Sequence, residues 1–392
     1  MRIVRDEERR ARLGALHFLQ MDGVDPVEVT TALVSLHSSD PATVFLSLRA
    51  RVPGFETRDL ERALYEDRSL VRILGMRRTM WVVNADMGPV IHHSSTAALV
   101  GGEQRRLWKI VEEAGLASDG RSWVAETSRA TLEALQELGS ATAIELRREV
   151  PQLKEQVTVY KKDGGIAGTM GMSTRILFLL ATEGRILRGR PRGTWLSSQY
   201  EWATYEHWLG HARPELDPFQ AQQKTLGSWL SRFGPATEVD AKWWTGWPVT
   251  LVRKVLDTIG PEPVATSEGT GYLAPDDPGP PAVEPWVAFL PGLDPTVMGW
   301  KQRDWYVGGH AGAVFDRNGN AGPTIMIDGR VAGVWAQRPD GRVVWELLEK
   351  GLSGRQEQIE EKAEELQVWL SGHVVTPRFR TPLEKELASG GP

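Results

Sequence analysis

One arrangement of helices and turns recurs three times along this chain, and it constrains the fold more than any other feature. Each time, helices with amphipathic spacing are separated by short turns and are followed by two β-rich runs. These stretches cover roughly residues 5–85, 128–200 and 217–275. A helical core followed by a hairpin is typical of a winged helix. The sequence therefore predicts three tandem winged-helix units.

The hairpins of the first two units are basic at their centres. In the first, "LVRILGMRRTMWVV" has β-rich ends around a basic centre with two arginines, and a third arginine lies within the first end. In the second, a strand "RILRG" leads to an Arg-Pro-Arg-Gly tip, and "TWLSS" is predicted to return. In the third unit, "PVATSEGTGYLAP" has a Gly-rich turn.

The character of the chain changes after the Pro-rich run "PDDPGPPAVEP". Residues 285–349 alternate strand-like runs with the hairpin turns "DRNGN" and "RPDGR", which predicts a small β domain, a β-barrel or half-barrel. A charged helix near 353–372 follows, and the last ten or so residues are expected to be frayed. The fold class is thus α+β. The predicted domains are 1–127, 128–213, 214–276, 283–350 and 351–392.

Composition excludes several kinds of protein. The chain of 392 residues has no cysteine, and so no disulfide or cysteine nucleophile. It has no apolar run long enough to cross a bilayer, and its first residues are charged, so we expect a cytoplasmic protein without a membrane partner. No helix is of an obvious dimer type, so a monomer is expected. No cofactor and no metal are predicted.

Three features that could indicate a ligand or metal site are better explained by structural roles: a Gly-rich run, a pair of histidines and the many tryptophans. The run "KKDGGIAGTMGMSTR" lacks the Gly-Lys-Ser/Thr ending of a phosphate loop. His207 and His211 are four residues apart, but Trp208 stands where a zinc hydrolase has its glutamate. Most of the 16 tryptophans are expected in the core.

The stretch "LVSLHSSDPATVFLSLRAR", residues 33–51, places a polar group between two apolar faces. Asp40 followed by Pro41 predicts a capped helix start and needs no functional explanation. His37 and Ser39 are left unexplained by that role. On the residues alone, a catalytic pair and a merely structural turn both stay open.

Arginines supply the basic surfaces that this acidic chain otherwise lacks. The net charge is −5, yet residues 1–210 hold 28 Lys and Arg against 27 Asp and Glu. Arginines at alternate positions of the second hairpin are expected to project from one face, with few acids nearby in sequence. Such a row suits DNA phosphates or a narrow minor groove, although a solvated edge strand protected by charge is the alternative. The candidate DNA-binding residues are Arg49, Arg51, Arg72, Arg77, Arg78, Arg188, Arg190 and Arg192.

With these elements in order, the chain resembles the AlkZ-like family of bacterial DNA glycosylases. The resemblance covers most of the chain and is carried by the 33–51 stretch, "LVRILGMRRTMWVV", "FGPATEVDAKWW" and "FLPGLDPTVMGWKQRD". It implies tandem winged helices with a C-terminal β-barrel. It also implies a monofunctional glycosylase that removes bulky N7-alkylguanines from double-stranded DNA, in base excision repair and in self-resistance to a DNA-alkylating antibiotic.

The family's catalytic signature is Gln-x-Gln, or Gln-x-Asp in another branch. The corresponding positions here are His37 and Ser39. The resemblance implies that His37 acts on the attacking water as general base or orienter, that Ser39 holds the second contact of this water or the deoxyribose phosphate, and that Asp40 stabilises positive charge on the sugar.

Two other classes of function are weighed against the enzyme. One is a non-catalytic winged-helix protein that regulates transcription or binds damaged DNA, which the loss of both signature glutamines favours. The other is a winged-helix scaffold that binds protein or RNA. Release of a base from adducted DNA distinguishes the enzyme from both.

Overall fold

The computed structural model describes residues 1–20, 25–160, 165–275, 277, 279, 282, 284–349 and 353–390. It is a mixed fold, 49% helical and 19% strand. The chain divides into two compact units, residues 1–61 with 223–392 (unit 1) and residues 62–222 (unit 2). Two helices, α4 (Thr57–Tyr65) and α11 (Pro218–Phe233), run across the boundaries. The five domains expected from the sequence stay predictions.

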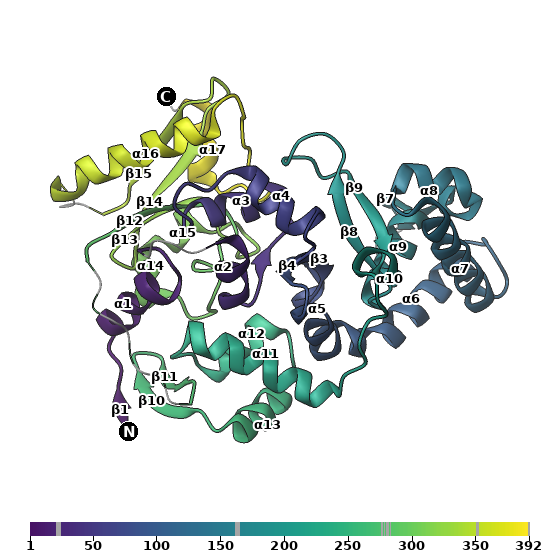
Figure 1. Ribbon diagram of the computed structural model, residues 1–392, viewed down its shortest axis with the longest axis horizontal. Helices are drawn as coiled ribbons and strands as arrows, with labels where there is room; N and C mark the ends of the chain where they lie inside the picture. The colour runs from purple at the N-terminus through teal and green to yellow at the C-terminus, as the bar shows by residue number, and fades with distance from the viewer. Residues whose placement is uncertain are drawn as a thin grey trace. The chain divides into compact units, whose positions relative to one another are not determined.

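Unit 1 contains both ends of the chain (Figure 1). Its helices are α1 (Asp6–Leu16), α2 (Pro26–Ala32), α3 (Pro41–Arg49), α12 (Glu238–Thr245), α13 (Val249–Ile259), α14 (Asp304–Val307), α15 (Ala311–Val314), α16 (Gln356–Leu370) and α17 (Pro382–Ser389). Its strands are β1 (Arg2–Ile3), β2 (Leu36–His37), β10 (Glu262–Thr266), β11 (Gly269–Leu273), β12 (Val287–Leu290), β13 (Thr324–Ile327), β14 (Arg330–Gln337) and β15 (Val343–Leu347).

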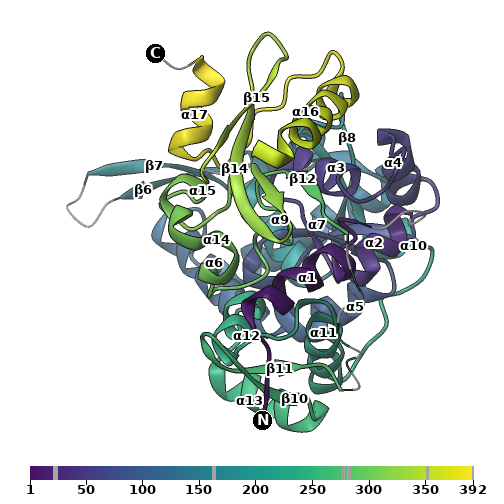
Figure 2. The ribbon, with the colours of Figure 1, turned by 90° about the vertical axis from the view of Figure 1, so that its left-hand side faces the viewer.

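The C-terminal strands form a four-stranded antiparallel sheet in the order β12-β13-β14-β15. The predicted turn "RPDGR" joins β14 to β15, as expected. Among the described residues these strands do not close, so the predicted barrel is not confirmed. Helices α16 and α17 pack on this sheet, and Figure 2 shows them flanking β14 and β15.

Helix α17 contradicts the expectation of a frayed C-terminus. Thr381 caps it by accepting the Glu384 N–H, and Glu384 is buried in an ion pair with Arg380 at 2.7 Å. The sequence places these residues in a short polar tail, so no local pattern indicates their burial against β14.

Two landmark segments of the sequence bind each other in unit 1. Asp240, in "FGPATEVDAKWW", accepts the Thr237 N–H and hydroxyl in a capping box that begins α12. Its other oxygen accepts the backbone N–H groups of Lys301 and Gln302, from "FLPGLDPTVMGWKQRD", each at 2.9 Å. Trp300 donates from its indole to the carbonyl of Phe233. Each segment therefore depends on the other for its conformation.

Unit 2 is built on a sheet and a group of helices that cover it. The helices are α5 (Met87–Ile91), α6 (Val100–Glu113), α7 (Gly120–Leu138), α8 (Ala143–Glu149), α9 (Met172–Thr182) and α10 (Tyr205–Leu209). The strands are β3 (Leu70–Leu74), β4 (Met80–Asn84), β5 (Ala141–Thr142), β6 (Gln156–Tyr160), β7 (Ile166–Gly171), β8 (Ile186–Pro191) and β9 (Tyr200–Thr204). Figure 1 shows α7 and α9 beside β8 and β9.

The sheet of unit 2 contains the two predicted basic hairpins. Its order is β4-β3-β8-β9-β5, and β3 joins β8 where Arg72 stands opposite Arg188. The return strand of the second hairpin was misplaced: it is Tyr200–Thr204, and not "TWLSS". The predicted tip was also too early in the chain, because Arg190 and Pro191 belong to β8, where Pro191 pairs with Tyr200, and the connection to β9 spans residues 192–199. Residues 161–164 of the Gly-rich run lie outside the described residues. The winged-helix count stays a prediction.

His17 is a buried titratable group that makes folding of unit 1 depend on pH. Its Nδ1 lies 2.8 Å from the Thr296 hydroxyl and its Nε2 lies 3.0 Å from the Arg232 carbonyl. Burial, together with the positive charge of Arg51, lowers the pKa of His17 to about 3. An unfolded histidine titrates near its usual value of about 6.5, so the unfolded chain binds one more proton between these two values.

The free energy of unfolding should therefore fall as the pH is lowered from about 6.5 to about 3, by up to roughly 1.4 kcal/mol per pH unit for this one group. His17→Gln removes that contribution, so urea titrations across this range should give a shallower pH dependence for the variant. His211→Gln, at an exposed histidine, is the control. An unchanged slope in His17→Gln would contradict the assignment.

Candidate functional site

The His37–Asp40 motif lies between a short strand and a capped helix in unit 1. β2 ends at His37, and α3 begins at Pro41 with Asp40 as its N-cap. The Asp40 carboxylate accepts the Ala42 N–H at 3.1 Å, as the sequence predicted for a helix start. His37 and Asp40 are buried, whereas Ser39 is partly exposed.

The His37 ring has its hydrogen-bonding roles set by the next residues. The Ser39 backbone N–H donates to His37 Nδ1 at 3.3 Å. Because Nδ1 is then an acceptor, the neutral ring carries its proton on Nε2. Nε2–H is a donor, so this tautomer offers a hydrogen bond to an oxygen atom instead of taking a proton from it.

Arg378 is a component of this site that sequence reasoning missed. Its backbone N–H donates to the second carboxylate oxygen of Asp40 at 2.8 Å, and its guanidinium donates to the Ser39 carbonyl at 3.1 Å. Gln337 of β14 holds the preceding segment by bonding to His373 and Val375. Arg378 lies 338 residues from Asp40, and no local pattern could have indicated the contact.

The Asp40 carboxyl is an unusual acid because of this environment. Burial raises its pKa above the usual range, while the N–H groups of Arg378 and Ala42 oppose the rise. A carboxylate with a raised pKa is a stronger base than an exposed one. The motif thus contains a donor in His37 and a basic carboxylate in Asp40.

Arg49 and Arg51, at the end of α3, were predicted to bind DNA. Arg51 is buried and forms a bidentate ion pair with Asp294, at 2.8 and 2.7 Å, with both side chains fully buried. It is therefore a structural residue, and its geometry does not support the predicted DNA contact. Arg49 is partly buried and pairs with Glu365 at 3.3 Å.

The first basic hairpin also divides into buried and exposed arginines. Arg72 is buried, donates to the Tyr65 hydroxyl at 3.0 Å and lies over the Tyr200 ring, so it too serves the core of unit 2. Arg77 and Arg78 form the turn between β3 and β4. Arg78 is exposed and pairs with Glu103 at 2.7 Å.

The second hairpin does not carry the uniform arginine row that alternation predicted. A register shift between Arg188 and Pro191 interrupts the alternation. Arg188 is half-buried over the rings of Tyr200 and Trp202. Arg190 lies over Tyr65, and Arg192 pairs with Glu145 and Glu201 at 3.2 and 2.9 Å. The expected unpaired row was wrong, because acids from other elements reach it: Glu66 lies 3.7 Å from Arg190, and Glu145 pairs with Arg192. Arg190 and Arg192 are nonetheless exposed.

The contacts of Asp40 predict the stability of the motif. Asp40→Ala removes both accepted hydrogen bonds and should lower the free energy of unfolding by about 1–3 kcal/mol. Asp40→Asn keeps one acceptor oxygen for the α3 cap and should lose less. Denaturant titration of both variants measures this, and an alanine variant as stable as the parent chain would show that neither bond matters.

Membrane and metal chemistry find no support in the described part of the chain. No helix there is both long and apolar enough to cross a membrane. In the same residues, no group of three or more His, Asp or Glu side chains is placed to hold a metal ion.

Comparison with known proteins places these features in a family. The family model described as "DNA glycosylase AlkZ-like" matches residues 30–369. The Streptomyces sahachiroi DNA glycosylase AlkZ has a similar structure, with a TM-score of 0.72 and 18% sequence identity over 94% of this chain and 97% of that one. That likeness shows a shared fold. No match was found among the curated proteins. Because the family model spans most of the sequence, the chain belongs to the AlkZ-like DNA glycosylases.

Proposed function

We propose that this DNA glycosylase hydrolyses the N-glycosidic bond of bulky N7-alkylguanine adducts in double-stranded DNA, with His37, Ser39 and Asp40 as its catalytic residues. The observation that carries the proposal is the fixed donor and acceptor pattern of the motif: Ser39 N–H to His37 Nδ1, and Asp40 held by Ala42 and Arg378. We further propose that the activity protects a cell that makes a DNA-alkylating antibiotic.

The leaving group in this reaction needs little help. An N7-alkylated guanine is cationic, so the bond to C1′ breaks without prior protonation and leaves an oxocarbenium-like sugar. The enzyme then has to place a water and stabilise positive charge. We assign the first task to His37 Nε2–H, which donates to an oxygen of the water or of the DNA backbone.

Asp40 suits the second task. Its negative charge stabilises a positive sugar, and its raised pKa makes it able to accept the proton that the attacking water loses. The Ser39 hydroxyl supplies a second contact for the water. No step uses a lysine Schiff base, so base release without strand cleavage is expected. Since a bulky adduct already lies in a groove, the base does not have to be flipped out of the helix.

Excision of an adducted base tests the role of His37. With DNA carrying a bulky N7-guanine adduct, His37→Ala should slow base release roughly 100-fold or more, the usual cost of losing one positioned polar group. His37→Gln should retain much of the rate, because the amide keeps one acceptor and one donor. His310→Ala, at a partly exposed histidine of unit 1, is the control.

The two His37 variants separate the possible roles. If glutamine is as slow as alanine, His37 is a general base and not an orienter. If neither variant is slow, His37 has no part in the reaction. A parent chain that binds DNA but releases no base from any adduct would support the non-catalytic DNA-binding protein instead.

We propose that five arginines bind DNA: Arg49, Arg77, Arg78, Arg190 and Arg192. Variants of the two exposed arginines at the second hairpin, Arg190 and Arg192, test this proposal. Arg190→Gln with Arg192→Gln should flatten the dependence of log K on log[salt] by about 0.9 for each phosphate that the variant no longer neutralises. Arg129→Gln, an exposed arginine on α7 paired with Glu133, is the matched control. Equal slopes for all three proteins would remove this hairpin from the DNA interface.

A further inference from the structure

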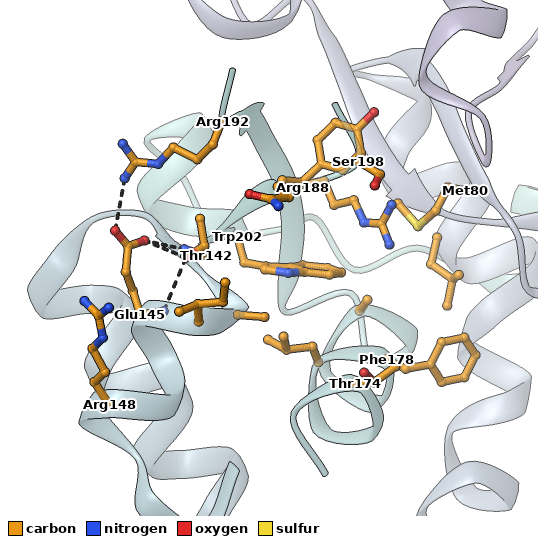
Figure 3. Close-up of a pocket in the computed structure, with 17 residues that line it drawn as sticks. Met80, Thr142, Glu145, Arg148, Thr174, Phe178, Arg188, Arg192, Ser198 and Trp202 are labelled. Atoms are coloured by element: carbon orange, nitrogen blue, oxygen red, sulfur yellow. Dashed lines mark hydrogen bonds and ion pairs between the residues drawn. The ribbon is translucent and has the colours of Figure 1, made fainter. Parts of the chain in front are cut away.

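Unit 2 contains a pocket of about 500 Å³ that the excision chemistry does not use. It lies between β8, β9, α8 and α9, and every residue that lines it belongs to unit 2. Its volume falls within the range of small-molecule sites, roughly 300–1,000 Å³. Figure 3 shows the Trp202 indole in the middle of the pocket, with Arg188 on one side and Phe178 and Thr174 on the other.

The walls favour a flat aromatic ligand. Trp202, Tyr200 and Phe178 supply three aromatic faces or edges, and Leu177 and Met80 complete the apolar lining. Aromatic pairs gain energy beyond the burial of their area when they stack with an offset or meet edge to face. A planar ring therefore has more to pack on here than an aliphatic chain of equal volume.

The polar lining favours an anion. Three arginines line the pocket, Arg148, Arg188 and Arg192, against one acid, Glu145; Glu201, outside the lining, also pairs with Arg192, so the charge around the pocket is positive by one. Glu145 is already engaged, because it accepts the Thr142 N–H and hydroxyl in the capping box of α8 and pairs with Arg192. The remaining positive charge favours a ligand that brings its own negative charge.

Arg188 is positioned in advance for such a ligand. Its guanidinium carbon is 5.1 Å from the ring centroids of both Tyr200 and Trp202, so two aromatic rings hold it in place. A guanidinium that stacks on aromatic rings binds a planar oxyanion edge to edge, through two parallel hydrogen bonds. The side chain loses little freedom when such an anion arrives.

We propose that this pocket binds a planar aromatic group that carries one anionic substituent, with the ring packed among Trp202, Tyr200 and Phe178 and the anion on Arg188. The same chemistry has two sources, a free aromatic carboxylic acid and a nucleotide with its phosphate. The site rests on no part of the proposed excision chemistry, and its lining includes neither His37 nor Asp40.

Calorimetric titration of the full chain tests the site with three probes. Quinoline-2-carboxylate should bind one to one, and the neutral quinoline-2-carboxamide should bind roughly tenfold or more weakly, because a charge-assisted hydrogen bond is missing. The third probe, deoxyadenosine monophosphate, shows whether the ligand of the pocket is a nucleotide or a free aromatic acid. If it binds at least as tightly as the carboxylate, the ligand is a nucleotide; if it binds more weakly, the ligand is a free aromatic acid.

Variants locate the binding in this pocket. Arg188→Met should weaken the carboxylate roughly tenfold and leave the carboxamide unchanged. Thr174→Trp fills the pocket from an exposed position of α9 and should abolish both, while Arg129→Met should change neither. The proposal is overturned if neither the carboxylate nor the nucleotide binds, or if binding persists in both pocket variants.

Discussion

A fully buried ion pair between Arg51 and Asp294 is the interaction on which the candidate site of unit 1 depends. Arg51 also donates to the carbonyls of His17 and Ser47 and to the Thr296 hydroxyl, so its charge is surrounded by acceptors. Asp294 in turn accepts the Ser47 hydroxyl and the Thr296 N–H. A buried pair repays its desolvation only when its remaining hydrogen bonds are made, and here they are. The pair fixes the C-terminal end of α3, whose N-terminal cap is Asp40.

Asp240 is a second buried carboxylate of unit 1 whose hydrogen bonds are all made, and most of its partners are backbone N–H groups. Asp240 is fully buried and satisfies four donors, two from Thr237 and two from residues 301 and 302. Both carboxylates hold the segment that follows β12. Asp294 belongs to this segment and binds Arg51, whereas Asp240 belongs to α12 and binds the N–H groups of residues 301 and 302. The Pro291–Arg303 segment has no regular secondary structure, and these hydrogen bonds to two buried carboxylates stabilise its conformation. Its conformation is what lets Asp294 meet Arg51.

Whether an interaction could be predicted from the sequence depends on how far apart in the sequence its two residues lie. Asp40-Pro41, the hairpins at 70–84 and 262–273 and the turn at 338–342 are local, and the sequence predicted each of them. Arg51 and Arg72 were assigned to DNA because each stands in sequence beside other arginines, Arg51 next to Arg49 and Arg72 in the first basic hairpin. Asp294 is 243 residues away and Tyr200 is 128 residues from Arg72. Alternation predicted three arginines on one face of the second hairpin, but a register shift between Arg188 and Pro191 interrupts it, and Arg192 lies beyond the end of β8. The spacing of residues in the sequence predicts where a strand lies, but the packing of the folded chain determines which arginines are buried and which are exposed.

The geometry of His37 bears on the expected match between this residue and the first glutamine of the family's signature. A glutamine side chain offers one acceptor, its carbonyl, and one donor group, its amide nitrogen. His37 in its present tautomer offers the same pair: Nδ1 accepts the Ser39 N–H, and Nε2–H donates. A histidine in this tautomer therefore keeps an acceptor and a separate donor, as a glutamine does, but it differs from glutamine in size and is more rigid, because the imidazole has fewer rotatable bonds. The Ser39 carbonyl and the Asp40 carboxylate, which complete the motif, are held by Arg378, a residue beyond the part of the chain that the family model matches. The His-x-Ser motif thus offers the donor and the acceptor that a glutamine would offer at position 37, on a more rigid side chain, and the C-terminal segment that contains Arg378 holds the two residues that follow Ser38.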